Sequence, residues 1–318
     1  YFMKLAETVT FGGSGLDRAA AIRGTQEGLP AADDITIVLW RGRVLFEKRE
    51  KAKLFKTSVF NDYLSEGRWL LLGFDSGVKI FACDISHWTP ADYQAPDPNV
   101  FFDPTEQQHP AFGDNALFCE LRAYMGNMTS RDAELSATAK SVFHWHNANQ
   151  FCAKCGEKLK VEMSGWQRKC DSCHTSYFPR IDPVVIMLVT HGNSVLIGRS
   201  PNWPDRMYSL LAGFMEPGET IEAAVRREVM EESGIAVGEV SYLASQPWSF
   251  PNTLMIGCHG HALDAKINID PNELEDALWI SKSDLVLAFS NEDFQVRPAR
   301  FGSIAQFLLK NWLADSLS

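Results

Sequence analysis

The sequence predicts an α/β protein in which an N-terminal α+β domain and a small metal-binding ribbon precede a C-terminal α/β/α sandwich. Three observations support this fold class. Pairs of apolar or alternating strands recur in both halves of the chain, two Cys-x-x-Cys pairs stand between them, and one long helix near residues 220–233 is surrounded by strands. We therefore expect three domains, over residues 1–146, 147–180 and 181–318.

The N-terminal domain is predicted from two pairs of strands and two helices. Residues 35–48 and residues 69–84 each alternate as two strands about a central turn. A stretch rich in Pro and Asp over 90–110 is typical of a loop, and helices are expected over 116–125 and 130–148. These residues contain no catalytic constellation, so we expect a non-catalytic scaffold or dimerisation domain.

The ribbon is predicted from four cysteines in two Cys-x-x-Cys pairs with 14 residues between the pairs: Cys152, Cys155, Cys170 and Cys173. Four thiolates bind Zn²⁺ tetrahedrally and leave no open position for catalysis, so the spacing indicates a structural zinc site. Two redox-active dithiols are the alternative. Zinc ribbons often bind nucleic acid, but acidic residues here partly cancel the basic ones and leave no strong basic patch.

The C-terminal domain is predicted from apolar strands around the long helix, with a second helix over 304–312 closing the chain. The expected strands lie at 184–189, 194–198, 208–212, 240–244, 254–258 and 277–280. Strands that surround one helix and pack against another suggest layers of helix, sheet and helix.

Composition excludes some classes of protein. The chain has 318 residues, is 45% hydrophobic, and carries a formal net charge of −10, which argues against a broad electrostatic grip on nucleic acid. No apolar run reaches the roughly 20 residues of a membrane span, and no signal-peptide pattern is present. The seven cysteines do not form a disulfide framework, so we expect a cytoplasmic protein.

The most informative stretch runs from Gly213 to Ile235 and follows the pattern G-x5-E-x7-R-E-U-x-E-E-x-G-U, where U is apolar. On its helix Glu228 and Glu232 share one face, and Glu231 lies on the flank of that face. Carboxylates crowded in this way repel one another, and a hard divalent cation with oxygen ligands would offset the repulsion. A solvated acidic helix face is the alternative. The pattern favours a carboxylate platform for Mg²⁺-dependent phosphate chemistry.

Local residues support this loop and helix. Gly218 allows the loop to turn where a side chain would clash, and Thr220 is expected as the N-cap. Gly234 is expected to end the helix in the left-handed region.

At every specified position the stretch resembles the Nudix box, which implies a Nudix α/β/α sandwich. The resemblance implies that Glu228, Glu231 and Glu232 bind the metals or activate water. It also implies that Arg227 orients a glutamate rather than touching substrate. In this family the box determines the reaction type, and residues outside it select the substrate.

A second stretch, Ser245–Met255, resembles the S-Q-P-W-P-F-P-x-S signature of the NADH pyrophosphatase subfamily of Nudix hydrolases. It matches six of the eight specified positions, with Ser249 replacing a proline and Thr253 replacing a serine. Residues 177–183 also resemble that subfamily's Y-Y-P-R-x-D-P segment, with Phe178 in a tyrosine position. The zinc ribbon just upstream completes the domain order of the subfamily.

The resemblance implies a substrate pocket and a further metal ligand. Phe178 and Phe214 match aromatic positions that stack on adenine, and Ile186 and Ala305 match apolar positions of the adenine pocket. Trp248 matches the signature aromatic. The remaining implied ligand is the carboxylate of Glu273, for which a charge at a helix N-terminus is the alternative role. The resemblance also implies a homodimer whose two subunits build each site.

The expected activity is hydrolysis of the pyrophosphate bond of NADH or NAD⁺ to NMN(H) and AMP, with catalytic Mg²⁺ or Mn²⁺ and structural Zn²⁺. One alternative is removal of NAD caps from RNA by the same chemistry, and another is hydrolysis of other nucleoside diphosphate derivatives. A non-catalytic nucleotide sensor and a zinc-ribbon nucleic-acid adaptor are rivals of other classes. The intact set of box glutamates disfavours both.

Overall fold

The computed structural model describes residues 4–60, 68–91, 93–94, 103–201, 203–291 and 293–317. Contacts between Cα atoms divide the chain into two compact units. The N-terminal unit comprises residues 11–181 and 248–252, and the C-terminal unit comprises residues 1–10, 182–247 and 253–318. Among the described residues, no helix is long and apolar enough to cross a membrane.

The N-terminal unit contains an eight-stranded sheet with the path β5-β6-β1-β2-β8-β7, to which β4 and β3 add alongside β1 and β2. Its strands are β1 (Ile35–Trp40), β2 (Arg43–Glu47), β3 (Lys51–Ala52), β4 (Leu54–Lys56), β5 (Trp69–Asp75), β6 (Val78–Asp84), β7 (Gln107–Gln108) and β8 (Ala116–Cys119). The two predicted strand pairs are confirmed. Part of the predicted 90–110 loop (residue 92 and residues 95–102) lies outside the described residues, and β7 is a short strand near its end.

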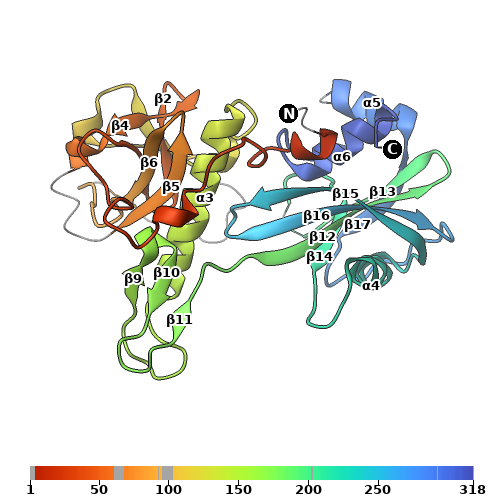
Figure 1. Cartoon of the computed structure of the whole chain (residues 1–318). Coiled ribbons are helices and arrows are strands. Elements are labelled where there is room, and N and C mark those ends of the chain that lie inside the picture. The colour runs from red at the N-terminus through yellow and green to blue at the C-terminus, as the bar shows by residue number, and fades with distance from the viewer. Residues whose placement is uncertain are drawn as a thin grey trace. The chain divides into compact units, whose positions relative to one another are not determined.

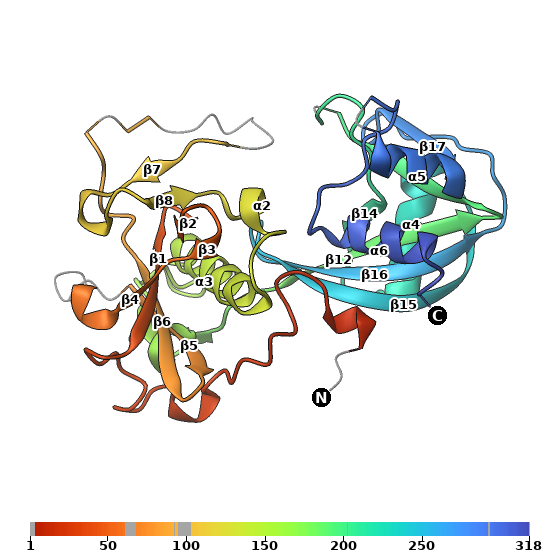
Figure 2. The same cartoon turned by 90° about the horizontal axis from the view of Figure 1, so that it is seen from above.

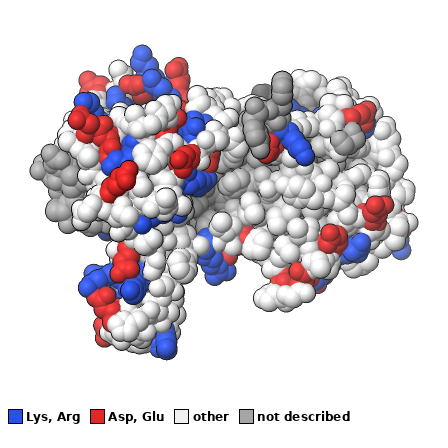
Figure 3. All heavy atoms as spheres, viewed as in Figure 1, with Lys and Arg blue, Asp and Glu red and all other residues white. Residues whose placement is uncertain are grey.

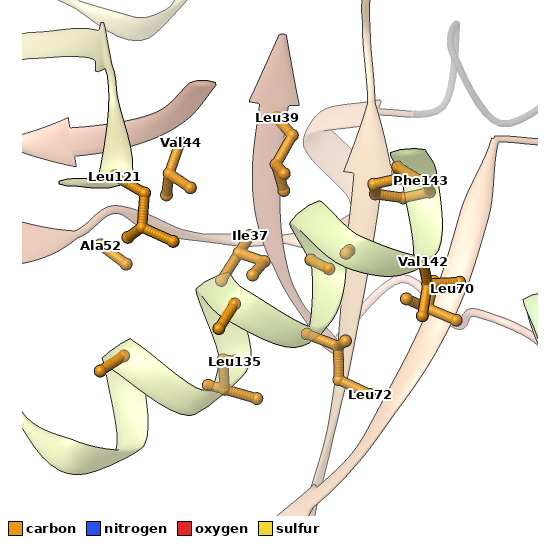
Figure 4. Packing of buried hydrophobic residues seen from close by; sticks show 14 of the residues in the cluster. Ile37, Leu39, Val44, Ala52, Leu70, Leu72, Leu121, Leu135, Val142 and Phe143 are labelled. Atoms are coloured by element: carbon orange, nitrogen blue, oxygen red, sulfur yellow. The ribbon is translucent and has the colours of Figure 1, made fainter. Parts of the chain in front are cut away.

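One long helix, α3 (Ser130–Ala148), packs on this sheet and confirms the helix predicted over 130–148. Thr129 caps it by accepting a hydrogen bond from the Asp132 backbone N–H at 3.1 Å. Figure 2 shows α3 lying against β1, β2 and β3. In the core, Leu135 of α3 meets apolar side chains of β1 and β5, including Ile37 and Leu72 (Figure 4).

The helix predicted over 116–125 is wrong in its first half. Residues Ala116–Cys119 form β8, which pairs antiparallel with β2, and only α2 (Leu121–Tyr124) is helical. Burial decides this difference, since Ala116 and Phe118 lie fully inside a core cluster between strands. Tertiary pairing therefore overrides the local preference of this segment.

The ribbon is a three-stranded sheet of β9 (Lys160–Glu162), β10 (Gln167–Lys169) and β11 (Ser176–Tyr177). It belongs to the N-terminal unit, and Figure 1 shows it beside the ends of β5 and α3. Its surface carries both charge signs close together (Figure 3), as the sequence predicts. One exposed pair joins Lys160 to Asp171.

The C-terminal unit is built on a six-stranded mixed sheet with the path β15-β16-β12-β13-β17, and β14 pairs with β12. Its strands are β12 (Asp182–His191), β13 (Ser194–Arg199), β14 (Leu211–Phe214), β15 (Val237–Trp248), β16 (Thr253–Ala262) and β17 (Asp276–Ser281). The helices are α4 (Ile221–Ser233), α5 (Lys282–Ser290) and α6 (Ile304–Leu313). The sequence did not predict α5.

Alternation along β12 places the helices on opposite faces of this sheet. Ile186 and Leu188 join the cluster of α5 and α6, whereas Val185, Met187 and Val189 join the cluster of α4. Figure 1 shows α4 on one side of the sheet and α5 and α6 on the other. The predicted α/β/α sandwich is confirmed.

Candidate active site and zinc centre

Local capping places the acidic helix α4 in the C-terminal unit. The Thr220 hydroxyl accepts a hydrogen bond from the Ala223 backbone N–H at 3.3 Å, which confirms it as the N-cap. At the other end Gly234 adopts φ 69° and donates its N–H to the Met230 carbonyl. Val225 and Val229 are fully buried against the sheet, so the acidic positions of α4 lie on its remaining faces.

The box carboxylates are crowded and partly withdrawn from water. Glu228 and Glu232 are 8% and 7% exposed, whereas Glu231 is exposed. Burial, and then repulsion from Glu228, Glu273 and Glu231, raises the pKa of Glu232 to about 8. Burial is also the first cause that raises the pKa of Glu228. The carboxylates of Glu228, Glu231 and Glu232 repel one another when charged, and a bound cation would reduce this repulsion.

Arg227 donates hydrogen bonds to Glu219, Glu228 and Glu231 through its three guanidinium nitrogens. Its Nε and one terminal nitrogen donate to the two oxygens of Glu219 at 2.6 and 2.9 Å. The other terminal nitrogen donates to Glu228 at 2.8 Å and to Glu231 at 2.9 Å. The paired guanidinium lowers the pKa of Glu219 to about 2. The sequence pattern contained Glu219 without a role, and the structure shows it as the bidentate anchor of Arg227.

These residues fit a hard divalent cation by the chemistry of their donors. Carboxylate oxygens are the ligands Mg²⁺ prefers, and Mg²⁺ keeps several waters, so the oxygens need not converge tightly. Within the described part of the chain, only the four ribbon cysteines bring all their ligand atoms within 4.8 Å of one another. The glutamate oxygens do not all lie this close to one another, although one Arg227 nitrogen contacts both Glu228 and Glu231.

Gly213, the first residue of the box, lies against the Glu228 side chain. It sits in β14, and a Cβ built on it would overlap the Glu228 carboxylate. The sequence pattern required this glycine without showing why. Close approach between a strand backbone and a functional carboxylate is the reason.

We expect Gly213→Ala to displace the Glu228 carboxylate and to lower kcat at least tenfold, because a misplaced catalytic group loses alignment. Ala212→Ser, at the adjacent exposed position of β14, is the matched control and should retain activity. Steady-state kinetics and Mg²⁺ titration of both variants test this. Equal activity in the two variants would show that Glu228 does not need its present position.

Gly218 is required for a different reason than the sequence suggested. Its φ is 97°, a region that side-chain-bearing residues rarely adopt, but a Cβ there would meet no atom within 4 Å. The predicted clash is therefore wrong, and backbone conformation alone favours glycine.

The four ribbon cysteines form a compact thiol cluster. The Sγ atoms of Cys152 and Cys173 are 3.5 Å apart, as are those of Cys155 and Cys170. A disulfide would hold its sulfurs about 2.05 Å apart, whereas four sulfurs about 2.3 Å from one Zn²⁺ lie roughly 3.8 Å from each other. The geometry and ligand type fit Zn²⁺. Cys83, Cys119 and Cys258 are buried.

The signature loop contributes side chains to the core of the N-terminal unit. Residues 248–252 belong to that unit, and the Trp248 and Phe250 rings both meet the Phe11 ring edge-on, with centroids 6.3 and 6.2 Å away. Ser249, which replaces the subfamily's proline, is 2% exposed and donates its hydroxyl to the Ala137 carbonyl of α3 at 2.8 Å. The departure from the signature therefore adds a buried hydrogen bond.

Ser249→Ala should lower the free energy of unfolding by about 1–2 kcal/mol, because it removes a buried hydrogen bond. Chemical denaturation checks the value. Ser245→Ala, four residues upstream at a half-buried position, is the control and should change stability less. Equal losses in both variants would mean that the bond to Ala137 contributes nothing specific.

The other predicted substrate residues occupy different settings. Phe178 is 66% exposed in the N-terminal unit, and Phe214 is 61% exposed in β14. Ile186 and Ala305 are buried in one core cluster. Glu273 is exposed in a turn that follows Asp270, so it does not occupy a helix N-terminus, although its charge acts on both Glu228 and Glu232.

Three family models match successive parts of the chain. An NADH pyrophosphatase-like rudimentary NUDIX domain matches residues 33–145, an NADH pyrophosphatase zinc ribbon domain matches 147–178, and a NUDIX domain matches 179–300. The NAD-capped RNA hydrolase NudC of Stutzerimonas stutzeri is 35% identical over 208 residues, covering 65% of this chain and 72% of that protein. This chain belongs to the Nudix family.

Further relatives of this Nudix chain differ in name and length. The human NAD-capped RNA hydrolase NUDT12 is 44% identical over 199 residues, which cover 58% of this chain and 43% of that protein. The human mitochondrial NAD(P)H pyrophosphatase NUDT13 is 40% identical over 178 residues, which cover 55% and 51%. The Nudix chain thus spans about half or less of the length of these two relatives.

Proposed function

We propose that this chain hydrolyses the pyrophosphate bond of NADH or NAD⁺ and releases NMN(H) and AMP. The observation that carries the proposal is the acidic face of α4, where the buried carboxyl groups of Glu228 and Glu232 would coordinate a divalent cation. The names of the relatives support a dinucleotide substrate. The zinc ribbon and the signature loop support the same subfamily.

The proposed mechanism assigns a task to each acidic side chain. Glu228, Glu231, Glu232 and Glu273 would hold Mg²⁺ or Mn²⁺, which neutralises the diphosphate and makes water more acidic. Arg227 keeps Glu219, Glu228 and Glu231 in place through the bonds described above. Water adds to one phosphorus, the bridging P–O bond breaks, and a carboxylate of the cluster accepts the proton. No covalent protein nucleophile is needed.

The substrate contacts and the assembly are further parts of the proposal. Phe178 and Phe214 would stack on adenine, since both rings are largely exposed. Ile186, Trp248 and Ala305 would shape the pocket from partly or fully buried positions. We also propose a homodimer and a division of tasks among residues 1–146, 147–180 and 181–318. We also propose the cytoplasm as the location, because the four ribbon cysteines fit a zinc site rather than disulfides.

Removal of NAD caps from RNA is the second candidate. It breaks the same bond with the same glutamates, and two of the relatives above are named NAD-capped RNA hydrolases. The two candidates differ only in whether an RNA strand can extend from the AMP half of the substrate.

Product analysis tests both candidates. The full chain is incubated with NADH, NAD⁺, ADP-ribose or NAD-capped RNA, with Mg²⁺, with Mn²⁺ or without added metal. We expect metal-dependent release of NMN(H) from at least one NAD-containing substrate. Turnover of ADP-ribose alone would refute the NAD(H) assignment, and a lack of turnover of every substrate would refute the proposed chemistry.

A further inference from the structure

The N-terminal unit contains two neighbouring cavities beside the ribbon. One lies between the sheet, the end of α3 and the ribbon, and the other lies between the sheet, residues 24–30 and the ribbon. The smaller has a volume of about 270 Å³ and the larger about 990 Å³. Trp69 and Val161 line both cavities, so the two spaces adjoin at these side chains. The proposed catalytic glutamates lie in the other unit, and the activity proposed above uses neither cavity.

The smaller cavity is lined by a buried arginine without an acidic partner. Arg168 is 8% exposed, and its Nε donates to His146 Nδ1 at 2.9 Å. Its terminal nitrogens donate to the carbonyls of His146 at 2.9 Å and Leu159 at 3.4 Å. Across the described residues, no carboxylate forms an ion pair with Arg168. The His146 carbonyl near the end of α3 and the Leu159 carbonyl of the ribbon offset part of its charge, and no carboxylate offsets the rest.

The other charges of this cavity add to the positive excess. Arg68 pairs with the buried Asp84 at 3.2 Å, and exposed Lys158 lines the same space. Three cationic side chains against one carboxylate leave a formal excess of two positive charges. His146 adds no charge at neutral pH, because burial and then Arg168 lower its pKa to about 4. An anion with about two negative charges would balance the cavity.

The larger cavity is mainly apolar and aromatic. Trp69, Leu71 and Phe81 line it from the sheet, and the Trp69 and Phe81 rings meet edge-on with centroids 6.4 Å apart. Val161 and Met163 line it from the ribbon and are 41% and 39% exposed. Exposed apolar side chains around a hollow are unusual on a free surface and favour a flat apolar ligand.

We propose that the two cavities together bind one nucleoside monophosphate unit, with its phosphate in the cationic cavity and its base in the aromatic cavity. The doubly charged phosphate matches the charge excess, and the base stacks or packs against the apolar wall. The unit comes either from free AMP or from a nucleotide within an RNA strand. Both sources present the same phosphate and base.

Photolabelling maps the site directly. The full zinc-loaded chain is irradiated with 2-azido-AMP, and the labelled peptides are identified by mass spectrometry. We expect label within residues 68–84 or 158–168, in addition to any label in the C-terminal unit. Label confined to the C-terminal unit would overturn the proposal.

Charge variants then quantify the site. Lys158→Glu lies in the cationic cavity, and Lys154→Glu, an exposed lysine of the same ribbon that lines neither cavity, is the matched control. Lys158→Glu should reduce labelling in the N-terminal unit at least tenfold, whereas Lys154→Glu should not. Equal labelling in the two variants would overturn the proposal.

Competition separates the two sources. Unlabelled AMP that suppresses the label at micromolar to millimolar concentration supports a free nucleotide, and suppression by a short uncapped RNA alone supports a strand. Suppression by neither would overturn the proposal. NADH turnover by Lys158→Glu should equal that of the wild type, so a failure of this site is distinguishable from a failure of the proposed activity.

Discussion

Glu232→Gln is expected to lower kcat for NADH or NAD⁺ by about a thousandfold or more while preserving the fold. The neutral amide of glutamine can neither balance the charge of a divalent cation nor accept a proton from water. A loss of about 4 kcal/mol of transition-state stabilisation lowers the rate by a factor near a thousand. Glu232 is 7% exposed on α4, so water cannot substitute for it easily. Single-turnover kinetics with saturating Mg²⁺ separate this loss from weaker substrate binding.

Glu232→Gln should also change how the free energy of unfolding depends on pH. Without added Mg²⁺, the folded-state pKa of Glu232 is about 8, above its ordinary value of 4.5, so the folded state binds the extra proton between these limits. Wild-type stability should therefore fall as pH rises from about 5 to 8, by up to roughly 1.4 kcal/mol per pH unit from this group. The glutamine variant lacks this slope.

Glu239→Gln is the matched control, because Glu239 is an exposed residue of β15 outside the box. It should keep both kcat and the pH slope of stability. Near-wild-type turnover by Glu232→Gln would refute the catalytic assignment of α4. If Glu232→Gln lost the pH dependence of stability but kept its turnover, Glu232 would be a buried carboxyl group without a catalytic role.

Loss of zinc is expected to have the second large effect, which is on the folding of the ribbon and on its packing against the rest of the N-terminal unit. Cys170→Ser should abolish zinc binding, because structural Zn²⁺ contributes about 10–16 kcal/mol in small zinc domains at neutral pH and needs all its thiolates. Cys170 is fully buried, and apart from cysteines the ribbon core is small, with Leu159 as its buried aliphatic residue. The ribbon should unfold locally, and hydrogen exchange over 150–177 measures this directly.

Cys258→Ser provides a matched control, since Cys258 is a fully buried thiol in the C-terminal unit away from the cysteine cluster. It should keep one zinc per chain and a protected ribbon. A ribbon that keeps its protection in Cys170→Ser, or after removal of zinc by a chelator, would contradict a structural role for the metal.

Several parts of the fold follow from local pattern. Alternation and turn residues predicted β1, β2, β5 and β6, and helical periodicity predicted α3 from Ser130 to Ala148. The caps of α4 at Thr220 and Gly234 were also predictable. Each depends on residues a few positions apart, so the chain carries the information within one window.

Other parts needed contacts between distant residues. The strand β8 forms because its side chains enter a core beside β2, and α5 packs its Leu285 into a cluster with β12 and α6. The partner of Ser249 is Ala137, 112 positions away. Sequence windows do not contain such partners.

The amino-acid sequence by itself determined the box, the cysteine ligand set and the order of the parts, because fixed spacing on one helix or in one knuckle places functional atoms together. Only the tertiary structure decided the reason for Gly213, the link from Arg227 to Glu219, and the cationic cavity around Arg168. These depend on which strand, helix or ribbon lies beside another. Burial and charge balance arise only when the distant segments pack.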